Sequence, residues 1–155
     1  MKLLGYVLIF LACSFTGIYS ARFYKHKLIN SYEYIEMLCV ISDNISLWHL
    51  ALNKIYDSIK NIELERIGYL DTLRSCGLAH AYREFSVKFL FDQEHEIFCE
   101  KLGTLPLVDT LKLCENEIKR LNKILDQQKE VIEKKIKLYP ALALLAGIAV
   151  IILII

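Results

Sequence analysis

Two uncharged apolar stretches, one at each end of the 155-residue chain, restrict what this sequence can fold into more than any other feature. Residues 3–21 and 139–155 contain no Asp, Glu, Lys or Arg. A helix that crosses the hydrocarbon core of a bilayer, roughly 30 Å thick, needs about 17–25 apolar residues, and both stretches qualify. The sequence therefore predicts an N-terminal transmembrane anchor at 1–21, a helical domain at 22–138 and a C-terminal transmembrane anchor at 139–155.

The segment between the anchors is formally neutral. It holds every charged residue except Lys2, and its acidic and basic residues are equal in number. Nucleic-acid binding requires a basic stripe that neutralises phosphates, and none is visible. We therefore expect no nucleic-acid partner.

The basic residues closest to the two anchors all lie on the side of the central domain. These flanking residues are Arg22, Lys25, Lys27, Lys134, Lys135 and Lys137. Positive charge in short flanks marks the cytoplasmic side of a membrane, and aromatic residues such as Tyr139 collect at its interface. We expect Pro140 near the water–lipid boundary. The pattern predicts a double-pass cell-membrane protein with a cytoplasmic central domain and both termini extracytoplasmic.

Two alternatives treat the first apolar stretch as a processed segment. Signal-peptide cleavage after Ala21 would place Tyr19, which is too large, at a position that requires a small residue. Lipid modification of Cys13, at the end of "FLAC", would leave a very short apolar core before it and a further apolar run after it. The sequence favours an uncleaved anchor, with a lipoprotein as the alternative.

The central segment has the periodicity of helices. Tyr34, Leu38 and Ile41 recur at three or four residues, and few glycines or prolines interrupt the pattern. Ser31 is predicted to cap one helix and Ser46 the next. Breaks are expected at residues 77 and 103, both glycines. The predicted fold class is all-α: a helical bundle flanked by two transmembrane helices.

The last helix has the most regular pattern. Thr104 is its expected cap, and Pro106 suits its first turn. The four–three spacing predicts an apolar seam, formed by Leu107, Leu111, Cys114, Ile118, Leu121, Leu125, Gln128 and Ile132. We expect this helix to continue into the second anchor. The seam either packs inside the bundle or is reserved for another subunit, which includes a possible homo-oligomer.

Candidates for chemistry are few. His95 and Cys99 share a helical face, but zinc needs three or four ligands, and a surface histidine beside a half-buried cysteine is the favoured interpretation. A metal-binding protein built on this pair remains an alternative. The five cysteines include no CxxC, so we expect reduced cysteines on apolar helix faces. The sequence has no glycine-rich phosphate loop and no nucleophile elbow. It predicts neither an enzyme nor a cofactor.

Several short motifs resemble one known family. They are Leu102 and Gly103 before the long helix, "SLWHLAL" at 46–52, and Lys137, Leu138, Tyr139, Leu142 and Gly147 at the last anchor. Together with "KLLGYVLIFLACSFTGIYSAR" at the start, they are similar to the stage III sporulation protein AB family. The chain departs from the family in "LGTLPLVDT", where a Ser-Asp-Arg type cap is usual, and at Ala143, where a glycine is expected.

The resemblance implies a fold and a role. The soluble domain would be similar to the cytoplasmic domains of type II secretion inner-membrane platform proteins. The protein would act in the mother cell, in a multi-protein membrane complex that links it to the forespore. Its expected partners are a secretion-type ATPase and other membrane subunits. We therefore expect a non-enzymatic assembly platform.

Overall fold

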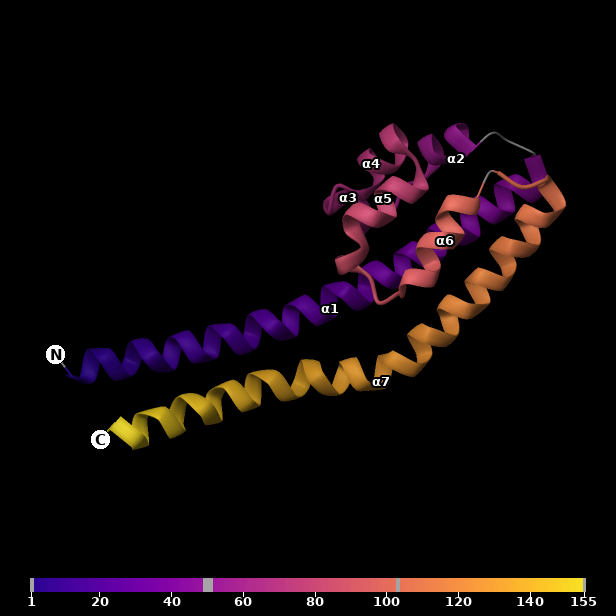
Figure 1. The fold of residues 1–155 in the computed structure, drawn as a ribbon. Coiled ribbons are helices and arrows are strands. Elements are labelled where there is room, and N and C mark those ends of the chain that lie inside the picture. The colour runs from indigo at the N-terminus through magenta and orange to yellow at the C-terminus, as the bar shows by residue number, and fades with distance from the viewer. Residues whose placement is uncertain (1, 49–51, 103, 155) are drawn as a thin grey trace. The chain divides into compact units, whose positions relative to one another are not determined.

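The computed structural model describes residues 2–48, 52–102 and 104–154 (Figure 1). These residues form helices and connecting segments, with no strand among them. The elements are α1 (Lys2–Trp48), α2 (Leu52–Ser58), α3 (Ile62–Arg66), α4 (Tyr69–Cys76), α5 (Leu78–Phe85), η1 (Ser86–Lys88), α6 (Gln93–Lys101) and α7 (Leu107–Ile154). The predicted all-α fold class is confirmed.

The chain forms two compact units. The terminal unit comprises residues 1–26 and 128–155, and the central unit comprises residues 27–127. Helices α1 and α7 each contribute to both units. The shorter helices belong to the central unit alone.

The core of the central unit is built on one face of α1. Tyr34, Leu38 and Ile41 are fully or almost fully buried, and their spacing of three to four residues keeps them on one side of the helix. Buried side chains from the short helices and α7 join them in one cluster, including Leu64, Leu70, Leu73, Leu121 and Leu125. The helical periodicity of the sequence therefore reflects a real buried face.

The predicted helix starts at Ser31 and Ser46 are wrong, because α1 runs through both residues. The buried Ser31 hydroxyl donates to the Lys27 carbonyl at 2.8 Å and accepts the Leu90 N–H at 2.9 Å. Ser31 thus joins α1 to the segment before α6. Ser46 is exposed, and its hydroxyl donates to a carbonyl of the same helix.

The two predicted helices that follow are also divided. The segment from Ser46 to Gly77 contains α2, α3 and α4, and the segment from Leu78 to Gly103 contains α5, η1 and α6. Gly68, with φ of 82°, precedes α4, and Gly77, with φ of 85°, separates α4 from α5. Such left-handed conformations favour glycine. The break at Gly77 is confirmed, whereas Gly103 lies outside the described residues.

Helix α7 begins directly after Pro106, whose carbonyl accepts the Thr110 N–H at 2.9 Å. The predicted cap at Thr104 is wrong: its hydroxyl donates to the Lys101 carbonyl at the end of α6. From Leu107, α7 continues through Pro140 to Ile154 without interruption. The prediction of a long final helix that includes the second apolar stretch is confirmed.

Candidate functional site

Among the described residues, one helix is long and apolar enough to cross a membrane, namely α1 over Val7–Leu47. In the first part of α1, polar side chains form hydrogen bonds with the backbone of the same helix. The hydroxyls of Ser14, Thr16 and Ser20 each donate to a backbone carbonyl three or four residues earlier, at 2.7–2.9 Å. Polar groups bonded in this way suit an environment without water.

The terminal unit is an antiparallel pair of helices. A Cβ built on Gly17 would collide with the Ala143 Cβ and would lie 2.9 Å from the Tyr139 carbonyl oxygen. A Cβ built on Gly147 would lie 3.3 Å from the Phe10 ring. Residue numbers therefore rise along α1 as they fall along α7, and both termini lie at the same end (Figure 1). Glycine lets two helix backbones approach closely.

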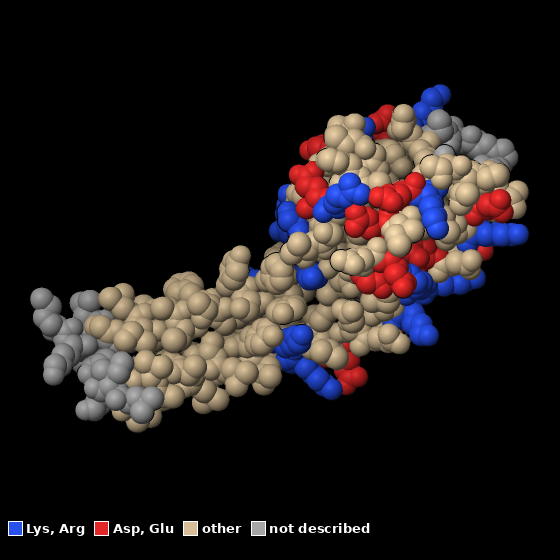
Figure 2. Space-filling model, viewed as in Figure 1, with Lys and Arg blue, Asp and Glu red and all other residues tan. Residues whose placement is uncertain are grey.

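The outward faces of this pair carry apolar side chains. Figure 2 shows a largely uncharged surface over the described part of the terminal unit. Its exposed residues include Leu8, Leu11, Phe15, Ile18, Leu138, Leu142, Leu145, Ile148 and Ile152. A contiguous exposed apolar surface of this kind indicates contact with lipid or with a partner.

One end of the pair holds the residues predicted for the membrane boundary. The Tyr24 and Tyr139 rings lie 5.5 Å apart, and the Lys135 Nζ lies 5.2 Å from the centroid of the Tyr24 ring. Pro140 follows Tyr139 inside α7. The other basic residues of the terminal unit at this boundary, Arg22, Lys25, Lys134 and Lys137, are exposed. Lys27 belongs to the central unit, where it borders a pocket.

The seam of α7 has two kinds of position. Cys114, Leu121 and Leu125 are buried in the core of the central unit, while Leu111 and Ile118 are partly buried against it. Gln128 is exposed and Ile132 is buried in the terminal unit, whereas the side chain of Leu107 lies outside the description. Leu111 and Ile118 line a groove of about 280 Å³ between α1 and α7.

The family-motif residues lie in both units. Leu102 is buried at the end of α6, in the core cluster of the central unit. Leu138 and Leu142 are exposed on α7, as is Lys137. Gly147 is buried against α1, where the close approach leaves little room for a side chain.

His95 is the centre of a buried polar network, so the expectation of a surface histidine is wrong. It is 0% exposed, and Cys99 is 3% exposed instead of half-buried. The His95 Nδ1 lies 2.6 Å from Glu117 Oε1, and Nε2 lies 2.7 Å from the Tyr34 hydroxyl. Glu117 also accepts two hydrogen bonds from Arg120, at 2.7 and 2.9 Å. The network joins α1, α6 and α7.

Burial and hydrogen bonding determine the charge states. Burial lowers the pKa of His95 from 6.5 and outweighs the opposing effect of Glu117. Burial alone would raise the pKa of Glu117, but its bonds to His95 and Arg120 lower it to about 2. His95 is therefore neutral beside an ionised carboxylate, so Nδ1–H donates to Glu117 and Nε2 accepts from the Tyr34 O–H.

Both ring nitrogens of His95 are hydrogen-bonded, one to Glu117 and one to Tyr34. Within the described residues, no group of three or more His, Cys, Asp and Glu is arranged to hold a metal ion. Burial also raises the pKa of the Cys99 thiol to about 12 and that of Cys114 to about 11. These thiols are protonated and unreactive. Cys76 departs from the expected core position, because it is exposed.

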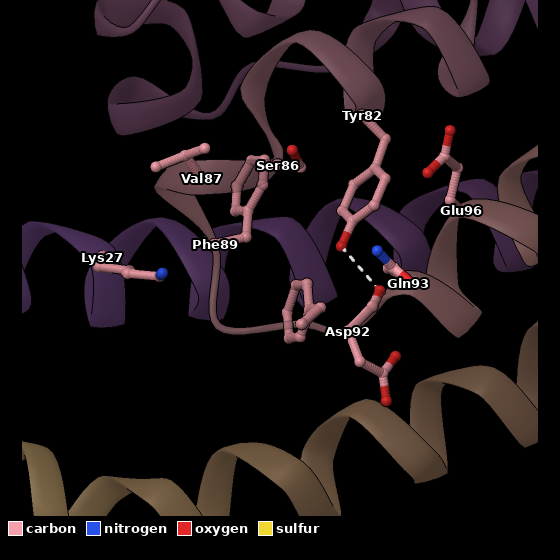
Figure 3. A pocket seen from close by; sticks show the side chains of 9 residues that line it. Lys27, Tyr82, Ser86, Val87, Phe89, Asp92, Gln93 and Glu96 are labelled. Atoms are coloured by element: carbon pink, nitrogen blue, oxygen red, sulfur yellow. Dashed lines mark hydrogen bonds between the residues drawn. The ribbon is translucent and has the colours of Figure 1, made fainter.

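A second cavity of the central unit, also about 280 Å³, is lined by residues of α1, α5, η1 and α6 (Figure 3). The Tyr82 hydroxyl donates to the Asp92 carbonyl at 3.3 Å. The carboxylate of Asp92 accepts from Arg120, and Glu96 accepts from Arg83 at 2.7 Å. The acidic side chains of this pocket therefore form ion pairs with arginines, and these pairs have a structural role.

Sequence reasoning missed Tyr34, Glu117 and Arg120 as polar partners of His95. The sequence did contain one indication of a buried ion pair. Glu117 follows Cys114 of the seam by three residues, and Arg120 follows Glu117 by three more. Comparison of the chain with protein-family models, with curated proteins and with solved structures gave no match. The resemblance to the sporulation family is therefore carried by its motif residues alone.

Proposed function

We propose that this protein is a non-enzymatic membrane subunit that holds a helical domain at the cytoplasmic face of the cell membrane. Both apolar stretches, 1–21 and 139–155, would cross the bilayer as the antiparallel pair of the terminal unit. The observation that supports this most directly is the tight contact of the pair at Gly17 and Gly147, combined with its apolar outer surface.

The charge distribution supports the proposed orientation. Arg22 and Lys25 of α1 and Lys134, Lys135 and Lys137 of α7 lie at the end of the pair opposite the termini. Positive residues beside a span remain in the cytoplasm. The central unit follows these residues in α1 and precedes them in α7, so it would be cytoplasmic.

The role in assembly rests on the motif residues. The resemblance implies a place in a sporulation membrane complex of the mother cell, beside other membrane subunits and a secretion-type ATPase. The buried network is consistent with a structural domain, because the side chains of His95 and Glu117 form hydrogen bonds with Tyr34, with Arg120 and with each other inside the folded unit.

Two measurements test the proposal. Reporter fusions after residue 138 should report a cytoplasmic location, and fusions after residue 155 an extracytoplasmic one; an extracytoplasmic report at 138 contradicts the orientation. In reciprocal pull-down from detergent-solubilised membranes, the chain should capture the secretion-type ATPase that the resemblance implies. An unrelated double-pass protein serves as the control bait. Failure to capture the ATPase above this control contradicts the docking role, whichever topology is found.

A further inference from the structure

The strongest concentration of unbalanced charge in the terminal unit lies around the ring pair of Tyr24 and Tyr139. Two clusters of basic residues meet there, although they are more than 100 residues apart in the sequence. They are Arg22 and Lys25 on α1, and Lys134, Lys135 and Lys137 on α7. Glu130 and Glu133 are the nearby acidic residues in sequence, and Glu130 bonds Lys134 at 2.6 Å.

The register of the helix pair places these cations at one level. The contact between Tyr24 and Tyr139 and the position of Lys135 over the Tyr24 ring align residue 24 with the turn at 135–139. At 1.5 Å per residue, residues 22–25 and 134–139 occupy a band about 8 Å deep along the axes. One headgroup layer of a bilayer is also about 5–8 Å thick.

The chemistry of the band matches that layer. Arg22, Lys25 and Lys137 are exposed, and none of them forms an ion pair with another described residue. The two tyrosines supply amphipathic rings of the kind found at headgroup level. The apolar surface of the pair begins at this level with Leu138 and continues with Leu142 on α7.

We infer that this basic and aromatic collar binds the headgroups of anionic phospholipids, in preference to neutral ones. The inference rests on the proposed membrane insertion and names the lipid class that the boundary selects. Lys and Arg near an anionic membrane surface are attracted to it. Phospholipid headgroups and free phosphate ions both carry the phosphate group that these cations would bind. The apolar surface beside the collar favours a lipid as the ligand.

The test uses the full chain in vesicles of phosphatidylcholine with about 30% phosphatidylglycerol. Electron paramagnetic resonance of spin-labelled lipids measures the association of each lipid with the protein. We expect about fivefold stronger association of the glycerol lipid. A variant with Arg22→Gln, Lys25→Gln, Lys135→Gln and Lys137→Gln should lose this preference. The control variant changes four exposed lysines of the central unit to glutamine, namely Lys54, Lys60, Lys101 and Lys112, and should keep it.

Four outcomes overturn the inference. Equal association of the two lipids with the unaltered chain contradicts it, as does an equal preference in the collar variant. The preference could also be lost in about 50 mM phosphate but kept in chloride of the same ionic strength. That result would show that the site binds free phosphate. Extraction of the protein from the vesicles by alkaline carbonate contradicts the proposed membrane insertion itself, and the collar with it. A carbonate-resistant protein without preference contradicts the collar alone.

Discussion

The single residue that most distinguishes the central unit is His95. Its neutral ring links a hydroxyl on α1 to a carboxylate on α7 in a site closed to water. A buried polar group is stable only while its partners are present, because an unpaired partner keeps the cost of desolvation without a hydrogen bond. A substitution at His95 therefore removes hydrogen bonds that join α6 to both α1 and α7.

We expect His95→Leu to lower the free energy of unfolding by about 2–4 kcal/mol, because it removes the acceptor of the buried Tyr34 hydroxyl and one of the two hydrogen bonds to Glu117 Oε1. Denaturant unfolding of the full chain in detergent, followed by circular dichroism, measures the change. Glu94→Gln is the control, since Glu94 is an exposed contributor to the Arg120 ion pairs. A loss of stability no larger than that of the control would contradict the role of the network.

The same residue predicts how stability depends on pH. The folded pKa of His95 lies below 6.5, so the unfolded chain binds a proton first as the pH falls through 6.5, and stability decreases. Glu117 adds a further loss between pH 4.5 and about 2, where the unfolded carboxyl is protonated and the folded one is not. The decrease between pH 7 and 5 should be smaller in His95→Gln, which keeps a donor and an acceptor but does not titrate. Equal slopes in the two proteins would refute this assignment.

At the level of elements, the serine residues show why a local sequence pattern does not always predict where a helix begins. A serine before an apolar run predicts a helix cap, but an interior serine can bond its own helix equally well. Ser31 does both: its hydroxyl donates to the Lys27 carbonyl of α1 and accepts the N–H of Leu90 from a segment 59 residues away. A hydrogen bond to a residue so distant in the chain cannot be predicted from the sequence around the serine.

Ser31→Ala should destabilise the central unit by about 1–3 kcal/mol, since the Leu90 N–H loses its acceptor. Ser46→Ala is the matched control: Ser46 is exposed and bonds only within α1, so a change within about 0.5 kcal/mol is expected. Hydrogen exchange of the Leu90 amide reports the local effect. An unaltered exchange rate in the Ser31 variant would show that the contact is unimportant.

In the terminal unit, Gly17 determines how closely α1 and α7 approach. Gly17→Ala should weaken the pair by about 1–3 kcal/mol, because its Cβ would collide with the Ala143 Cβ and the Tyr139 carbonyl. Gly5→Ala meets nothing within 4 Å and should be neutral or slightly stabilising. Unfolding in mixed micelles with increasing dodecyl sulfate compares the two. Equal stabilities would contradict the close packing.

For the whole molecule, periodicity and charge predicted the all-α class and the long final helix, because these depend on patterns within one segment. They did not predict that α1 would run unbroken from Lys2 to Trp48. They did not predict which helices would pair. The sequence has no GxxxG motif in its last stretch, yet Gly17 and Gly147 each face the other helix. The burial of His95 was equally hidden, since its partners Tyr34 and Glu117 come from distant segments.

We propose that the two ends of the chain form one antiparallel helix pair inside the membrane. Cysteine cross-linking tests it directly in carbonate-washed membranes. A Cβ at position 147 would lie 3.4 Å from the Cys13 Cβ, close to the 3.5–4.5 Å typical of a disulfide. Gly147→Cys should therefore link to Cys13 on oxidation, as identified by mass spectrometry of the joined peptides. The controls are Ile148→Cys, at an exposed neighbouring position, and Gly147→Cys combined with Cys13→Ala.

A linked peptide for Gly147→Cys, with little or none for either control, is the result this account predicts. Absence of the 13–147 link in membrane-bound protein, or an equal yield from position 148, would contradict it.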